Sequence, residues 1–153
     1  MITGVSRSRR PAIRLVALRC EAMSADPRYV LATESNSLLL YFDAFQTPTC
    51  FVGHTHVPAL YYLPSGAANA RQCEMRTPQW NSPVHINSGR LIANPGSVGQ
   101  PRDGNPAASY ALFDLDNNTW EHRRVRYPVR ETQSRMRERD LPARLVERLA
   151  QGH

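Results

Sequence analysis

Two histidines separated by one residue give the strongest chemical signal in the sequence. They occur in the run Gly53-His54-Thr55-His56, directly after the β-rich residues 49–52. In extended backbone, side chains two residues apart point the same way, so both imidazoles can converge on one metal ion or contact two neighbouring ions. Gly53 lets the chain turn at the end of the strand, the edge where open α/β sheets place their ligands. Isolated His-x-His pairs also occur at plain surfaces, so the spacing alone leaves both interpretations open.

The elements before the histidine pair are predicted to be a strand and a helix. Residues 12–18 are apolar and β-rich except for Arg14, which predicts a strand in the N-terminal segment. A helix is expected near residues 34–46, because Leu38, Leu39, Phe42 and Phe45 recur at helical spacing, and Pro48 ends it. Short strands at 49–52 and 59–63 then flank the polar turn that carries the histidines.

After residue 65 the pattern changes to short β-rich runs separated by proline, glycine and asparagine, with no helical period until the C-terminus. The candidate strands are residues 72–76, 84–87, 91–93, 110–115 and 120–127, which suggest a β-meander. Asp116-Asn117-Asn118 is typical of a hairpin turn. A C-terminal helix is expected near 141–151, with Asp140 as its N-cap and a leucine stripe on one face.

Several other side chains have a plain structural interpretation. Residues 94–104 contain too many turn-forming residues for a strand or helix, so a rigid turn is expected there. His85 is expected in a strand, His122 on a solvated face beside arginines, and Trp80 and Trp120 in the core or packed against a sheet. The C-terminal arginines flank the leucine stripe and are expected to form the hydrated face of the last helix.

Composition limits the class of protein. The 153 residues are 41% hydrophobic, which suits one compact domain, and no apolar run approaches the length of a membrane span. Three cysteines without a C-x-x-C pair favour a reducing, cytoplasmic location over a disulfide framework or a cysteine-rich zinc site. The formal charge is +6, with basic ends: residues 1–19 hold five arginines and no acid, and residues 119–153 hold nine arginines and five acids.

Three separated segments resemble one known family, in the order in which that family has them. CFVGHTHVPALYYL, then INSGRLIANPGSVGQPRDGNPAASYALFDLD, and finally a Leu-Pro-x-x-Leu helix resemble the C-terminal half of a bacterial calcineurin-like metallophosphoesterase. The resemblance runs from about Asp26 to the end. Residues 1–19 form a basic N-terminal segment that is partly out of the family pattern, and residues 20–153 match the C-terminal half of the domain.

The resemblance implies a fold and a site. The fold would be α/β, part of an αββα sandwich made mostly of strands. His54 and His56 would each bind one ion of a dinuclear centre of Mn, Zn or Fe, in which a metal-bridging hydroxide attacks the phosphorus of a phosphate ester. The positions expected near the substrate are Gly53, Thr55, Asn94, Gly96, Ser97 and Arg102.

The departures from the family are equally informative. The family's Asp-x-His, Gly-Asp-x-x-Asp and Gly-Asn-His strings do not occur in this sequence, and where the family has a further metal-binding histidine the chain reads Leu18-Arg19-Cys20-Glu21. Cys20 is a poor substitute for the missing ligand of a hard metal ion. We therefore expect the chain to be the C-terminal portion of a metal-dependent phosphoesterase, a gene fragment or a degenerate paralogue, with little or no activity alone and no catalytic residue of its own.

Two other functions stay open, and several partners are implied. A basic nucleic-acid-binding module could use the arginine-rich ends, although no row of exposed aromatic residues accompanies them, and a mononuclear zinc-binding protein could use the histidine pair. For the phosphoesterase we expect a phosphate-ester substrate, no membrane and a missing N-terminal half. A sheet edge left unpaired by that missing half would favour oligomers or aggregation.

Overall fold

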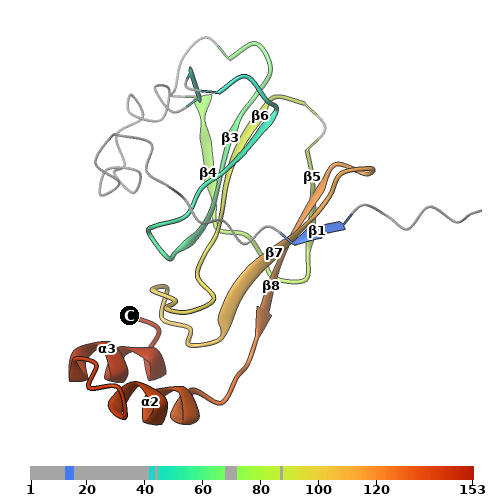
Figure 1. The fold of residues 1–153 in the computed structure, drawn as a ribbon. Helices are drawn as coiled ribbons and strands as arrows, with labels where there is room; N and C mark the ends of the chain where they lie inside the picture. The colour runs from blue at the N-terminus through green and yellow to red at the C-terminus, as the bar shows by residue number, and fades with distance from the viewer. Residues whose placement is uncertain (1–12, 16–41, 44, 68–71, 87) are drawn as a thin grey trace, which may run out of the picture.

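The computed structural model describes residues 13–15, 42–43, 45–67, 72–86 and 88–153, and within them the chain is mostly β-strand (Figure 1). The strands are β1 (Ile13–Leu15), β2 (Thr49–Phe51), β3 (Pro58–Leu63), β4 (Glu74–Arg76), β5 (Pro83–His85), β6 (Arg90–Pro95), β7 (Ala108–Asp114) and β8 (Thr119–Val125). The helices are α2 (Val129–Arg137) and α3 (Ala143–Glu147), which a 3₁₀ turn, η3 (Arg148–Ala150), extends.

The strands form two sheets of four. One sheet has the order β1-β7-β8-β5, and the other has the order β2-β6-β3-β4. Within the second sheet β2 runs parallel to β6, whereas β3 is antiparallel to both β6 and β4. The expected meander is therefore wrong except for the hairpins β3–β4 and β7–β8. Short β-rich runs identify strands, but the choice of partner depends on which faces the packed sheets bury.

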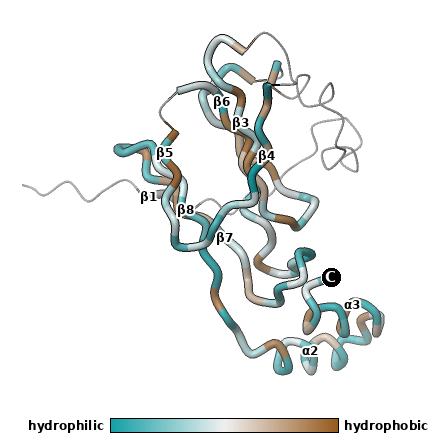
Figure 2. The backbone as a smooth tube through the Cα atoms, turned by 180° about the vertical axis from the view of Figure 1, so that it is seen from behind, coloured by the Kyte–Doolittle hydropathy of each residue, from teal (hydrophilic) through white to brown (hydrophobic). Residues whose placement is uncertain are grey.

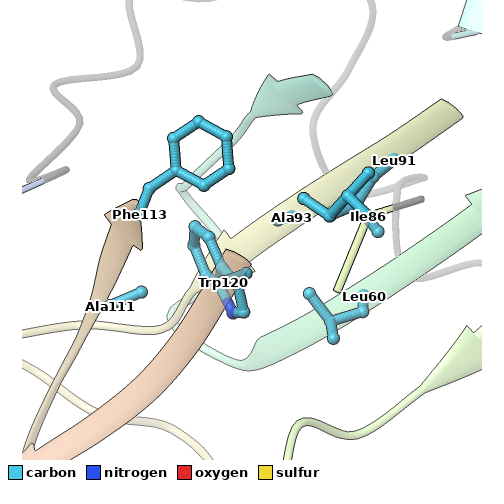
Figure 3. Packing of buried hydrophobic residues seen from close by; sticks show 7 residues of the cluster. All are labelled: Leu60, Ile86, Leu91, Ala93, Ala111, Phe113 and Trp120. Carbon is cyan, nitrogen blue, oxygen red and sulfur yellow. The ribbon is translucent and has the colours of Figure 1, made fainter. Parts of the chain in front are cut away.

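The core lies between the two sheets. Leu60, Leu91 and Ala93 of one sheet meet Ala111, Phe113 and Trp120 of the other, with Ile86 beside them (Figure 3). The Phe51 ring stacks on Trp120 at 5.3 Å between centroids and meets Phe113 edge-on at 5.1 Å. These contacts confirm an α/β chain built on two packed sheets, and they place Trp120, which is fully buried, in the predicted core.

A second apolar layer covers the outer face of the β2-β6-β3-β4 sheet. Phe42 is helical and fully buried, and it packs with Ala59, Tyr61 and Ile92. Because β3 and β6 are covered on both faces, four consecutive residues of β3 and five of β6 are buried, as in the central strands of α/β proteins. Of the helix expected near 34–46, residues 34–41 and 44 lie outside the described part of the chain, as do residues 12 and 16–18 of the first expected strand.

The C-terminal helices differ from the expectation. The predicted helix near 141–151 is shorter: α3 begins after Pro142, Asp140 is not its cap, and Leu141 at the start of the expected stripe is exposed. Helix α2, which the sequence did not reveal, buries only Gln133 and is mostly hydrophilic, so it has no apolar stripe to detect (Figure 2). Gln133 donates a hydrogen bond of 2.7 Å to the Val146 carbonyl and holds the two helices together.

Three smaller predictions concern the hairpin turn before β8, His85 and Trp80. The hairpin at Asp116-Asn117-Asn118 is confirmed, with Asn118 at a φ of +49° as a tight turn requires. His85 lies in β5 as expected. Trp80 is 58% exposed, so its core placement was wrong: it lies three residues before β5 and forms an isolated bridge with His122 of β8. None of the helices among the described residues is long and apolar enough to cross a membrane.

Candidate functional site

The turn that carries the histidine pair follows β2 directly, but its backbone is not extended. The Val52 amide donates to the Ala93 carbonyl at 2.9 Å, so pairing with β6 continues up to Gly53. His54 and His56 then adopt φ angles of +75° and +62°. The argument that an extended backbone aligns the two imidazoles is therefore wrong. Positive φ values at two non-glycine residues are uncommon, and such strained positions cluster at functional sites.

A hydrogen bond fixes the protonation pattern of His56. Its Nδ1 lies 2.7 Å from the Gln100 carbonyl oxygen. A carbonyl can only accept, so Nδ1 carries the proton and Nε2 keeps its lone pair. Metal-binding histidines in proteins commonly donate their second ring nitrogen in this way, which sets the tautomer and the ring orientation.

The surroundings of His56 favour the neutral form of its imidazole, because they lower its pKa. Burial has the largest effect and lowers the pKa of the imidazole, and the charges of Arg102, His54 and Arg148 lower that pKa further, while the hydrogen bond to Gln100 acts in the opposite direction. A neutral imidazole is the form that can donate a lone pair to a metal ion. The charges acting on the ring are all cationic.

Asn94 joins the histidine turn to the loop after β6. Its side chain is buried, and its Nδ2 donates to the Gly53 carbonyl at 3.2 Å and to Thr55 Oγ1 at 2.9 Å. Its Oδ1 accepts the Gly96 amide at 2.9 Å. Asn94 and Pro95 belong to β6, so the expected turn over residues 94–104 begins two residues later than predicted. The β-sheet pairing with β3 extends the strand despite the turn-forming residue types.

The remaining loop folds against the histidine turn. The Arg102 amide donates to the His56 carbonyl at 3.1 Å, and its side chain donates to Gln100 Oε1 at 3.2 Å. Ser97 Oγ accepts the Gln100 amide at 3.0 Å, which shapes the turn that presents the Gln100 carbonyl to His56. The structure therefore brings together Thr55, Asn94, Ser97 and Arg102. Hydrogen bonds join the histidine turn to the loop after β6.

A buried serine–histidine pair beneath the loop was missed from the sequence. Ser109 Oγ donates to the Pro95 carbonyl at 2.6 Å and therefore accepts from His122 Nε2 at 2.7 Å. His122 is 2% exposed, so the expected solvated position was wrong. The available signal was the alternation along β8, which puts His122 on the same face as the buried Trp120.

The described residues do not assemble a cluster of metal-binding side chains. No group of three or more His, Cys, Asp or Glu side chains gathers in the parts of the chain the structure describes. Asp103, which follows Arg102 in the loop against the histidine turn, forms an ion pair with Arg124. Cys20 and Asp26 lie outside the described residues. His54 and His56 bring two imidazoles to this turn, and the described residues add no third ligating side chain to form a cluster with them, so no reaction step can be derived from these residues.

Comparison with known proteins identifies relatives. No family model matches the chain. It is 35% identical over 103 residues to the uncharacterized protein MJ0912 of Methanocaldococcus jannaschii, which covers 67% of this chain and 38% of that protein. A crystal structure of a metallophosphoesterase from Sphaerobacter thermophilus is 46% identical and superimposes with a TM-score of 0.69, over 78% of this chain and 48% of that one.

The chain thus spans less than half the length of each of these relatives. The sequence identity and the shared fold agree with the resemblance carried by Gly53-His54-Thr55-His56 and the loop after β6. Over the region that it shares with them, this chain is related to the calcineurin-like metallophosphoesterases.

Proposed function

We propose that this chain is the C-terminal portion of a metal-dependent phosphoesterase, with His54 and His56 as ligands to the two ions of the complete centre. One observation carries the proposal: His56 donates Nδ1–H to the Gln100 carbonyl, which leaves Nε2 available to a metal ion. The relation to a metallophosphoesterase supports a phosphomonoester or phosphodiester as the substrate and divalent metal as the cofactor. Mn, Zn and Fe are the ions we propose.

The residues of the two loops have distinct roles in this proposal. Asn94 fixes the histidine turn through the Gly53 carbonyl and the Thr55 hydroxyl, so it is a positioning residue. Gly96 gives the chain a φ of +82°, and a Cβ there would lie 2.6 Å from Ser109 Oγ, so the close approach of the loop requires glycine. Ser97 and Arg102 face the substrate from the rim, where a hydroxyl and a guanidinium suit phosphate oxygens.

We also propose that the isolated chain has little or no activity. Hard and borderline divalent ions take four to six ligands, and carboxylates normally offset the charge of a metal pair. The coverage of less than half of each relative supports a missing N-terminal half as the source of those ligands. On this proposal the protein is cytoplasmic, and an exposed sheet edge makes it prone to form oligomers until that half is supplied.

The experiment compares metal binding and turnover in matched variants. Purified protein should bind Mn²⁺ or Zn²⁺ weakly, and the double variant His54→Ala, His56→Ala should lose that binding. His85→Ala, which removes an exposed strand histidine, should keep it. Hydrolysis of p-nitrophenyl phosphate or bis-p-nitrophenyl phosphate by the unaltered protein should not exceed that of the double variant. Strong turnover that the double variant abolishes would refute the claim of inactivity, and equal metal binding by all three proteins would refute the ligand assignment.

A further inference from the structure

Ser109 links the two sheets at the point where β6 ends and the loop of the candidate site begins. The Ala93 carbonyl of β6 accepts the Val52 amide at 2.9 Å, but the histidine turn begins at the next residue, Gly53. Two residues along, on the same edge of β6, the Pro95 carbonyl accepts the Ser109 hydroxyl at 2.6 Å. Ser109 belongs to β7 of the other sheet and is 1% exposed. A buried side chain from the facing sheet therefore supplies the donor that β2 no longer provides.

The same residue also contacts the loop on the other side of Gly96. The Ser109 amide donates to the Ser97 carbonyl at 2.9 Å, so its hydroxyl and its amide bind the carbonyls directly before and after Gly96. Gly96 has a φ of +82°, and a Cβ there would lie 2.6 Å from Ser109 Oγ, so the loop backbone lies directly against the hydroxyl. Ser109 thus fixes the path of three consecutive loop residues.

His122 sets the direction of the Ser109 hydroxyl. The Pro95 carbonyl can only accept, so the Ser109 hydroxyl hydrogen points to it and His122 Nε2 donates to Ser109 Oγ at 2.7 Å. His122 Nδ1 is buried without a hydrogen-bond partner among the described residues, which agrees with a neutral ring that carries its proton on Nε2. The ring is 2% exposed. The imidazole therefore keeps the hydroxyl hydrogen directed at the Pro95 carbonyl.

A short series of hydrogen bonds leads from this segment of the loop to His56. Ser97, whose carbonyl Ser109 holds, accepts the Gln100 amide at its Oγ at 3.0 Å. The Gln100 carbonyl in turn accepts the Nδ1–H of His56 at 2.7 Å. A displacement of Ser97 would therefore move the carbonyl that determines which His56 nitrogen carries the proton.

We infer that Ser109 and His122 are positioning residues of the candidate site: the buried pair holds the loop so that the Gln100 carbonyl keeps His56 in its Nδ1–H tautomer. The value of that tautomer for metal binding rests on the proposed function, because groups that orient a metal-binding histidine set which nitrogen is free. Ser109 and His122 act through the loop and contact neither imidazole of the histidine turn.

The test observes the ring nitrogens of His56 by NMR in the full chain without added metal, with His56→Ala to assign the signals. In the unaltered protein, at a pH where the ring is neutral, Nδ1 should be protonated and Nε2 should not. Ser109→Ala and His122→Leu should replace this pattern with the averaged signals of two exchanging tautomers. Hydrogen exchange of the Gln100 amide should become roughly tenfold faster in both variants, as expected for the loss of one buried hydrogen bond nearby.

A conservative variant and a matched control separate positioning from stability. His122→Gln should keep the His56 pattern, because its amide can donate to Ser109 in place of Nε2–H. Ile86→Val is the control for a buried site, since it loses packing but lies elsewhere. Ile86 bonds to Asn118 at the hairpin end of β7 and β8, whereas Ser109 lies at the opposite end. Ile86→Val should leave the His56 pattern unchanged.

Thermal unfolding checks that each variant is folded. Where Ser109→Ala or His122→Leu is not, Ser109→Cys serves instead, because its thiol is a weaker donor and should give a partial loss of the His56 pattern. An Nδ1–H pattern that is absent from the unaltered protein, persists in the folded Ser109 and His122→Leu variants, or is lost equally in Ile86→Val would overturn the inference.

Titration of the same samples with Zn²⁺ distinguishes this inference from the proposed function. Loss of the His56 pattern in Ser109→Ala supports the positioning role even if no sample binds Zn²⁺, in which case the proposed function alone fails. Zn²⁺ binding that depends on His54 and His56, together with an unchanged His56 pattern in Ser109→Ala, refutes the positioning role alone.

Discussion

His56 and His122 are each held through one ring nitrogen, but they lie in opposite environments. His56 sits in a loop with a strained backbone and donates to the Gln100 carbonyl, with Nε2 left as a lone-pair donor. His122 lies in β8 between the two sheets and donates to Ser109, and its Nδ1 is buried without a hydrogen-bond partner among the described residues. Burial lowers the pKa of both imidazoles.

The difference shows that one anchored ring nitrogen does not identify a metal ligand. The surroundings of the second ring nitrogen decide whether the histidine can bind a metal ion. At His56 those surroundings are two hydrogen-bonded loops around a half-buried ring, which a ligand can reach from solvent. At His122 they are the apolar interior next to Trp120, where no ligand has room to approach. His122 is therefore a structural residue that supports the Pro95 carbonyl through Ser109.

The largest effect is expected from removing the Trp120 side chain, which lies two residues before His122 on the same face of β8. Trp120→Ala empties a fully buried position that stacks on Phe51, and we expect the free energy of unfolding to fall by about 3–5 kcal/mol. Trp80→Ala is the matched control, because Trp80 is exposed and its loss should change stability by no more than about 0.5 kcal/mol. Urea denaturation measures both. Similar losses in the two variants would mean that the sheets do not pack around Trp120 as described.

A smaller effect is expected from breaking the serine–histidine pair. Ser109→Ala leaves the His122 N–H and the Pro95 carbonyl buried without a partner, which should lower the free energy of unfolding by about 1–3 kcal/mol. His56→Ala should cost less, because its ring is only partly buried and water can replace the lost hydrogen bond at Gln100. Ser134→Ala, at an exposed helix position, controls for the loss of a hydroxyl. An equal cost at Ser109 and Ser134 would contradict the structural role of His122.

The smallest effect is the dependence of stability on pH. The pKa of His122 is lowered in the folded protein by burial, so below about pH 6.5 the unfolded chain binds a proton that the folded chain resists. Stability should therefore be unaffected by this histidine above that pH and should fall as the pH drops toward its folded pKa, by no more than about 1.4 kcal/mol per pH unit. His122→Gln should flatten this slope, whereas His85→Gln in the exposed strand β5 should not. Thermal melts between pH 5 and 8 would show the difference.

Much of the fold follows from local sequence. The runs that become β2, β3, β7 and β8 alternate or are continuously apolar, and the hairpin residues before β8 are typical of a turn, so the strands could be located without a structure. Helix α2 could not, because it buries only Gln133 and so has no apolar stripe; its link to α3 is the hydrogen bond from Gln133 to the Val146 carbonyl. The pairing of β2 with β6 joins segments about forty residues apart, and no local pattern specifies such a contact.

For the site, the sequence by itself determined which functional groups are present: two imidazoles in Gly53-His54-Thr55-His56 and a glycine-containing polar loop after β6. Only the tertiary structure decided how these groups are used. It gave His54 and His56 positive φ angles, joined their turn to Asn94 and buried His122. The physical reason is that residue type and spacing set which atoms can donate, accept or bind, whereas burial, tautomer and local charge arise from contacts between segments that are distant in the chain.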